Sequence, residues 1–239
     1  MVAEKLVAAR PVPATAPRWG FLTNHALALV YVVLHPGSTV RQIAGDIGIT
    51  ERATLAILRD LDEDEIIERH RDGRRNTYSV DFSHLSRVRR GGVASPLTPR
   101  LFVEVVVKTL YDMADAQGTL PAGATPPTKV SEDDLTPRQG SWGFFTNHML
   151  ILLAMARDRT LTVRDLATTV GITERAVVGI INQMENEDVI ARTRDGRRNT
   201  YAIDYEKFRG FRGWSTGQWR LPPALIDIAA NGIRALSGS

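Results

Sequence analysis

The spacing of apolar positions predicts three consecutive helices near the N-terminus. Nine apolar residues in a row at 26–34 follow Thr23, a favourable N-cap residue, and predict a largely buried helix. Apolar residues at helical spacing then predict a short helix at 40–47 and a longer one from Glu51 to about Glu65. Gly48 suits the left-handed position that ends a helix. Two helices joined by a tight turn with glycine are typical of a helix-turn-helix.

After residue 65 the pattern changes from helical to strand-like. Two short runs, 66–71 and 74–80, flank the pair Asp72-Gly73. Asp-Gly between two such runs is typical of a β-hairpin. A helix-turn-helix followed by a hairpin is the arrangement of a winged helix.

The whole pattern occurs twice in the chain. Copy 1, from Trp19 to Asp81, recurs as copy 2, from Trp142 to Asp204, at a constant offset of 123 residues and without a gap. GITERA and RDGRRNTY are identical in the two copies. Beyond the hairpins the likeness weakens, but 101–110 and 224–233 both predict an apolar helix. We expect these two helices to pack together, or against the first helix of the other copy, because they are too apolar to be exposed.

The predicted fold class is mainly α with small β-hairpins (α+β), in two tandem winged helix-turn-helix domains. Domain 1 covers 19–117 and domain 2 covers 141–239, each including its long apolar helix. The stretch 118–140 is rich in Pro, Gly, Thr and Asp and is expected to be a linker, and 1–18 a flexible N-terminal arm. A duplicated unit predicts a pseudo-dimer with approximate two-fold symmetry.

Composition favours a soluble, cytoplasmic protein. The 239 residues are 43% hydrophobic and 24% charged, which is ordinary for a globular protein. We expect no membrane partner, because the N-terminus has no apolar segment long enough for a signal peptide or a membrane span. The net charge of +3 and the pI of about 9.4 hint at an anionic partner.

The sequence offers little sign of an enzyme. It has no Gly-rich phosphate loop, no nucleophile elbow and no cluster with metal-ligand spacing. The absence of cysteine excludes disulfides and thiolate metal sites. We therefore expect no catalytic residue, no metal and no cofactor.

The two hairpins are the first candidate functional surface, because each carries a cluster of arginines. The candidates are Arg71, Arg74, Arg75 and Asn76 in copy 1 and Arg194, Arg197, Arg198 and Asn199 in copy 2. Arginine matches phosphate oxygens and enters narrow minor grooves. The alternative is a solvated basic hairpin, but both copies keep the whole RDGRRNTY string while neighbouring positions differ.

The third helix of each copy is the candidate recognition helix for the DNA major groove. The candidate contacts are Thr50, Glu51, Arg52 and Arg59 in copy 1 and Thr173, Glu174, Arg175 and Asn182 in copy 2. Arginine can bind guanine and glutamate can accept from cytosine. The alternative is that Glu51 and Arg52 only begin the helix. The middle of each helix is poor in polar groups, so thymine methyl groups or DNA shape would contribute the rest.

Two further motifs allow more than one interpretation. Thr-Asn-His at 23–25 and 146–148 suits helix capping and packing against Trp19 or Trp142, with a phosphate contact as the alternative and metal binding weakly indicated. The aromatic and basic stretch 205–220 suits packing over a core edge, with base stacking as the alternative.

The motifs WGFLTNH, RQIAGDIGITERA and GRRNTY resemble those of small bacterial winged-helix transcriptional regulators often described as MarR-like. The resemblance covers about 19–81 and 142–204. It implies a DNA-binding regulator and applies to Arg52, Arg74, Arg75 and Asn76 and to Arg175, Arg197, Arg198 and Asn199. This chain departs from the family in having two winged helices, and in the apolar pairs Leu55-Ala56 and Val178-Gly179 in the middle of the third helix.

These patterns lead us to expect a sequence-specific transcriptional regulator of double-stranded DNA, associated with the nucleoid. The chain would act as a monomeric pseudo-dimer or as a homodimer, and an unidentified small-molecule effector is a possible further partner. Differences between the third helices predict related but unequal half-sites. The alternatives are a protein-interaction scaffold and a nucleoid-type binder with little sequence preference.

Overall fold

The computed structural model describes residues 19–72, 75–89, 106–121, 123–127, 136–137, 143–195 and 198–237. The expected flexible arm 1–18 and much of the expected linker 118–140 lie outside the described residues. So do Trp142, Arg74, Arg197 and the side chains of Arg75 and Arg198.

The protein is mainly helical with small antiparallel hairpins, as predicted. Copy 1 contains α1 (Asn24–Leu34), α2 (Val40–Ile47), α3 (Glu51–Glu63), β1 (Ile67–Asp72) and β2 (Arg75–Val80), and α4 (Phe82–Arg87) follows it. Copy 2 contains α7 (Asn147–Arg157), α8 (Val163–Val170), α9 (Glu174–Asn186), β5 (Ile190–Asp195) and β6 (Arg198–Ile203), and α10 (Tyr205–Gly210) follows it. Each boundary in the first set recurs 123 residues later in the second.

The remaining elements differ between the two halves. β3 (Val88–Arg89) pairs in parallel with β4 (Thr136–Pro137), and α6 spans Lys108–Ala116. After α10 come a 3-10 turn (Arg212–Trp214), the short hairpin β7 (Ser215–Thr216) and β8 (Trp219–Arg220), and α11 (Pro223–Leu236). In the described part of the chain, no helix is both long and apolar enough to cross a membrane.

Local capping explains why the helix boundaries repeat. Thr39 and Thr162 each form a capping box, with Gln42 and Asp165 respectively. Gly48 and Gly171, at φ 75° and 73°, end α2 and α8 in the left-handed conformation that glycine adopts without steric cost. These contacts involve residues three or four apart, so matching cap residues produce matching helix ends in the two copies.

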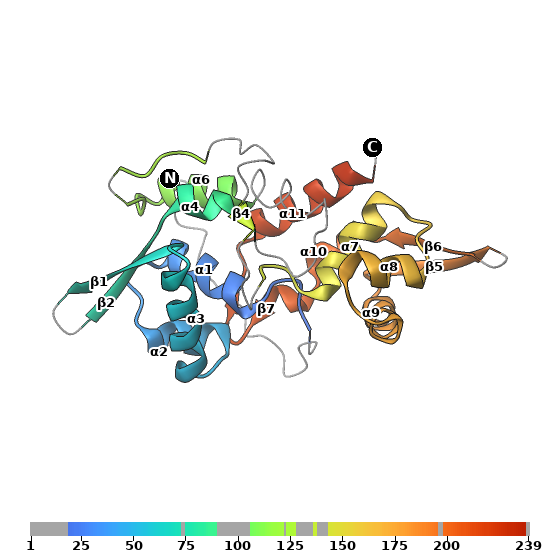
Figure 1. The fold of residues 1–239 in the computed structure, drawn as a ribbon, viewed down its shortest axis with the longest axis horizontal. Helices are drawn as coiled ribbons and strands as arrows, with labels where there is room; N and C mark the ends of the chain where they lie inside the picture. The colour runs from blue at the N-terminus through green and yellow to red at the C-terminus, as the bar shows by residue number, and fades with distance from the viewer. Residues whose placement is uncertain are drawn as a thin grey trace.

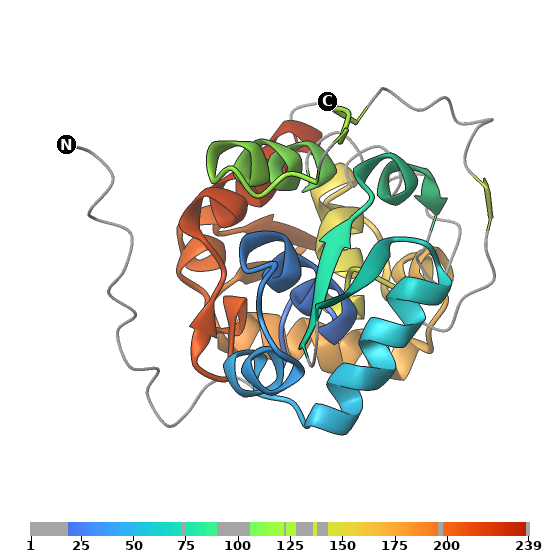
Figure 2. The ribbon, with the colours of Figure 1, turned by 90° about the vertical axis from the view of Figure 1, so that its left-hand side faces the viewer.

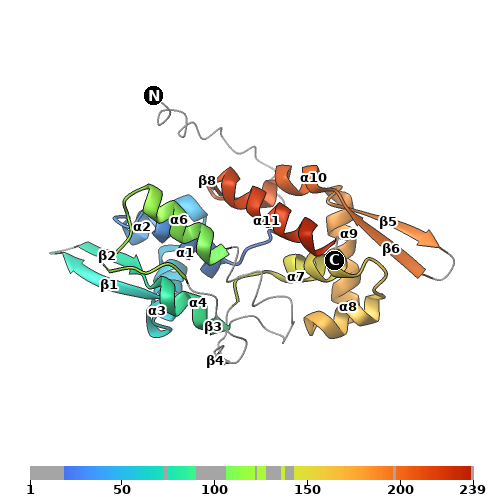
Figure 3. The same ribbon diagram turned by 90° about the horizontal axis from the view of Figure 1, so that it is seen from above.

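α1 and α7 form the centre of the hydrophobic core. Every residue of α1 from Ala26 to Leu34 is buried, as are most residues of α7. α6 packs on α1, and α11 packs on α7 (Figures 2 and 3). Our expectation for the packing partners was therefore wrong: α6 packs on α1, and α11 packs on α7 and α10 of its own half. Residues 101–105 of the first predicted helix lie outside the described residues. The two helices thus cover apolar faces of α1 and α7, the first helices of their own halves.

The two halves meet through the WGF(L/F)TNH motifs, at positions related by the repeat offset. Leu22 and Phe145 form an antiparallel bridge. On either side, Thr23 N donates to Phe144 O at 2.9 Å and Thr146 N donates to Phe21 O at 3.0 Å. The Thr146 hydroxyl donates to Gly20 O at 2.6 Å, and the Thr23 hydroxyl donates to Gly143 O. Each bond thus has its counterpart 123 residues away, which is the pattern of a two-fold contact.

The segment after α10 continues this junction into copy 1. Phe21 is fully buried, and its ring lies 4.9 Å from the rings of Phe208 and Trp214 and 5.2 Å from that of Phe211, between centroids. In Figure 1 α10 and β7 lie between the two halves, while the hairpins β1–β2 and β5–β6 point to opposite ends of the molecule.

Candidate nucleic-acid interface

The outward faces of α3 and α9 carry the residues predicted for DNA contact. Thr50, Glu51, Arg52 and Arg59 are exposed, and so are Thr173, Glu174, Arg175 and Asn182. The opposite face of each helix is buried, with Ile57, Leu58 and Leu61 in α3 and Val177, Ile180, Ile181 and Met184 in α9. The amphipathic pattern therefore orients the candidate stripe toward solvent.

Capping positions the first turn of each stripe. The Thr50 hydroxyl accepts from Ala53 N at 3.1 Å, and the Thr173 hydroxyl accepts from Ala176 N at 3.2 Å. Both hydroxyls thus act as N-caps, in addition to the DNA contact proposed for these residues. Glu51 and Glu174 lie in the first turn, where a carboxylate suits the helix dipole.

Arg52 and Arg175 are equivalent arginines in the first turns of the two stripes. Within the described parts of the chain, neither side chain has a hydrogen-bond or ion-pair partner. Arg59 differs, because its Nε lies 3.6 Å from Glu63 Oε1, although both side chains are about two-thirds exposed (69% and 67%). A pair this exposed contributes little to stability, so Arg59 can exchange Glu63 for another anion at small cost.

The hairpins carry Arg71 and Arg194 at equivalent, exposed positions. Arg71 lies opposite Asn76 in the register of β1–β2, and Arg194 lies opposite Asn199 in that of β5–β6. Arg192 is another arginine of strand β5, and it forms an ion pair within the protein, because its guanidinium lies 3.0 Å from Glu185 Oε2. Arg75 and Arg198 are placed in β2 and β6 by their backbone alone.

Acidic residues limit the contact surface at the C-terminal end of α3. Asp60, Asp62 and Glu63 lie in its last turns, with Asp64 and Glu65 directly after. Asp60 and Glu65 contact histidines, at 3.1 Å to His25 Nε2 and at 3.4 Å to His84 Nε2 respectively, and Glu63 pairs with Arg59. These carboxylates disfavour an anionic partner at this end of the helix.

The histidines of the Thr-Asn-His motifs connect the first helix to the third. His25 contacts Asp60, and His148 Nε2 lies 2.7 Å from Gln183 Oε1, at the equivalent positions of copy 2. The Trp19 ring stacks on His148 at 4.2 Å with 8° between the planes. Burial lowers the pKa of His148 below 6.5, although the bond to Gln183 acts in the opposite direction. The described residues contain no cluster of three side chains that could hold a metal.

The helix-capping interpretation of the two threonines, Thr23 and Thr146, holds only in part. The Thr23 hydroxyl accepts from Ala26 N at 3.3 Å, as predicted for a cap, whereas Thr146 makes no side-chain cap bond. Both hydroxyls also donate across the junction between the halves, to Gly143 O and Gly20 O. Sequence reasoning missed this role, and the signal was present: WGF and TNH are kept in both copies although neither lies on a predicted DNA-contact element.

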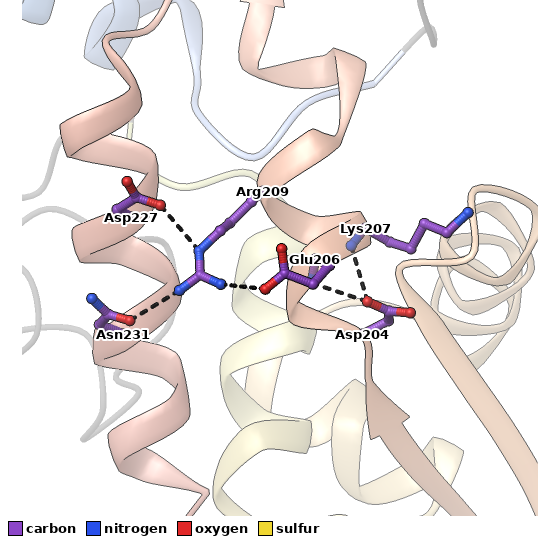
Figure 4. Close-up of polar contacts among 6 residues, drawn as sticks. All are labelled: Asp204, Glu206, Lys207, Arg209, Asp227 and Asn231. Atoms are coloured by element: carbon purple, nitrogen blue, oxygen red, sulfur yellow. Dashed lines mark hydrogen bonds and ion pairs between the residues drawn. The ribbon is translucent and has the colours of Figure 1, made fainter.

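The aromatic and basic stretch after copy 2 is used for packing. Phe208, Phe211 and Trp214 are buried. Arg209 joins α10 to α11, with its guanidinium 2.7 Å from Glu206 Oε1, 3.0 Å from Asp227 Oδ1 and 3.1 Å from Asn231 Oδ1 (Figure 4). A guanidinium surrounded in this way is committed to the fold and is not a candidate for nucleic-acid contact.

No protein-family model matches the chain. A search of curated proteins also finds no significant match.

Proposed function

We propose that the protein binds duplex DNA as a transcriptional regulator, with both copies acting as winged helices in one pseudo-dimer. α3 and α9 would enter the major groove, and the hairpins β1–β2 and β5–β6 would contact the flanking backbone or minor groove. The observation that carries the proposal is the pair of matched outward stripes, in which Arg52 and Arg175 are exposed and have no partner within the described protein.

The two-fold character of the junction supports the pseudo-dimer. Equivalent residues exchange hydrogen bonds around Leu22 and Phe145, so the two recognition helices are related as the halves of a dimer are. A dimer of this kind binds two half-sites about one helical turn apart, near 34 Å. Because α3 and α9 differ at Leu55/Val178, Ala56/Gly179 and Arg59/Asn182, the half-sites are expected to be related but unequal.

The testing experiment is selection of bound duplexes from a randomised DNA library at near-physiological salt. A motif with two related halves would support a site-specific regulator that uses both copies. Binding without an enriched motif would favour a nucleoid-type binder, and no binding would favour a protein-interaction scaffold. A perfectly palindromic motif would contradict the unequal half-sites.

Variants of Arg52 and Arg175 sharpen the test. Arg52→Ala and Arg175→Ala should each weaken binding to the selected duplex by about 1–3 kcal/mol, which is typical of a lost arginine–guanine contact. Each should also relax the base preference of one half-site only. Lys108→Ala is the matched control, because Lys108 is an exposed basic residue on α6, away from the two stripes, that pairs with Asp112. Equal losses in all three variants would indicate nonspecific electrostatic binding.

A further inference from the structure

Two apolar side chains break the polar stripes of the candidate recognition helices. Leu55 is 53% exposed and Val178 is 40% exposed, and no other large hydrophobic residue in the described part of the chain is exposed. They occupy equivalent positions, 123 residues apart. The fold therefore leaves one large apolar side chain uncovered in each copy, at the same place.

The neighbours of these residues are polar and partly basic. On α3, Arg52 precedes Leu55 by three residues and Arg59 follows it by four, so all three lie on one face. On α9, Arg175 and Asn182 flank Val178 at the same spacing. One isolated apolar side chain presents far less surface than the roughly 800 Å² that each partner buries in a stable protein–protein interface. The flanking charges favour an anionic partner with a small apolar feature.

The DNA major groove has such a feature in the C5-methyl group of thymine. We propose that Leu55 and Val178 each pack against a thymine methyl group, one in each half-site. This inference rests on the proposed function and adds the base that the middle of each helix selects. Leu55 with Ala56 offers more apolar surface than Val178 with Gly179, so the half-site bound by copy 1 should depend more on its thymines.

The test uses the full chain and the duplex selected as above, with thymine replaced by deoxyuridine in one half-site at a time. Deoxyuridine lacks only the methyl group and keeps every hydrogen bond of the base pair. Removing one buried methyl should weaken binding about fourfold. Leu55→Ala should cause a similar loss and, in the half-site bound by copy 1, should abolish the effect of deoxyuridine. Val178→Ala should do the same for the other half-site.

Four outcomes separate the two proposals. A loss on deoxyuridine substitution that disappears in the matching alanine variant supports the inference, because the two changes then remove one contact. Unchanged affinity for the deoxyuridine duplex overturns the inference while DNA binding stands. A loss that persists in the alanine variants also overturns it, since another residue then reads the methyl group. If the unmodified duplex is not bound at all, the proposed function fails instead. Leu55 and Val178 are exposed, so unchanged melting temperatures should show that both variants are folded.

Discussion

Copy 1 and copy 2 share every helix and strand boundary but differ in what surrounds them. The hairpin after copy 2 reaches back to α2, where Gln218 N donates to Asp46 O at 3.0 Å. There the Trp219 ring lies 5.3 Å from that of Tyr31, and Tyr31 Oη donates to Asp46 Oδ2 at 2.5 Å. Copy 2 has Ala154 and Thr169 in place of Tyr31 and Asp46. A repeated backbone can thus be kept while each copy acquires its own neighbours.

Tyr31 shows how burial strengthens this one-sided contact. Burial, followed by the hydrogen bond to Asp46, raises its pKa to about 12. The hydroxyl therefore stays protonated and remains a donor to Asp46 at all physiological pH values. No equivalent donor exists in copy 2, because Ala154 has no polar group.

The largest expected difference between the copies is in the packing at the junction. Phe21→Ala should lower the free energy of unfolding by about 3–5 kcal/mol, as for other large buried aromatics. Phe144→Ala should cost less, because the chain has Leu85, Val88 and Gly91 at the positions equivalent to Phe208, Phe211 and Trp214. Urea denaturation of both variants measures the difference. Equal losses would show that the aromatic cluster adds nothing specific to copy 1.

The contact between the β7–β8 hairpin and copy 1 can be broken at Gly217. Its φ is +59°, and a Cβ there would lie 2.5 Å from both Asp46 O and Gly48 N. Gly217→Ala should cost about 2–4 kcal/mol, of which about 1 kcal/mol is backbone strain. Gly118→Ala is the matched control, because Gly118 has φ +66° with nothing within 4 Å of an added Cβ.

Amide hydrogen exchange then locates the effect of Gly217→Ala. Exchange should accelerate in α2 more than in α8, because this hairpin packs on α2 and hydrogen-bonds to it at Asp46. Equal acceleration in both helices would mean that the substitution acts on the whole fold and not on the one-sided contact.

Exchanging the outward residues of one helix for those of the other should remove the proposed difference in DNA preference between the copies. The triple variant Leu55→Val, Ala56→Gly, Arg59→Asn gives α3 the residues of α9 at the three positions where the candidate stripes differ. Library selection with this variant should enrich two equal half-sites, with single-base preferences changed by about 1–3 kcal/mol. Half-sites that stay unequal would place the discrimination in the hairpins or elsewhere.

The smallest expected effect is the change of folding stability with pH that His148 introduces. The pKa of His148 is lowered in the folded state, so the unfolded chain binds more protons as the pH falls below 6.5. The stabilising effect of neutral His148 is therefore fully present above pH 6.5 and is lost as pH falls through the folded-state pKa. His148→Gln should reduce this loss between pH 7 and pH 5, as measured by urea denaturation. NMR titration should give His148 a pKa below 6.5, and a higher value would contradict the expectation.

Local features were predictable from the sequence, and long-range contacts were not. Thr39, Gly48 and Thr50 specify the ends of α2 and the start of α3 through bonds within four residues, so pattern alone locates these helices. The outward stripe from Glu51 to Arg59 follows from helical period in the same way.

The junction and the hairpin contact needed the structure. The bonds of Thr23 and Thr146 join residues 120 or more positions apart, and no spacing rule indicates them. The partner of each terminal helix was predicted incorrectly for the same reason, because an apolar face specifies burial but not what covers it. The ion pair between Arg192 and Glu185 could not be predicted either, because the sequence of a basic hairpin does not show which of its arginines form ion pairs within the protein.

The antiparallel bridge between Leu22 and Phe145 joins two parts of one polypeptide. Its closure is a first-order event, so the fraction closed does not depend on protein concentration. Two separate chains with the same motif would come apart on dilution. A regulator built this way would present both contact surfaces even when a cell holds only a few molecules of it, and each half would be free to change its surface without having to match an identical partner.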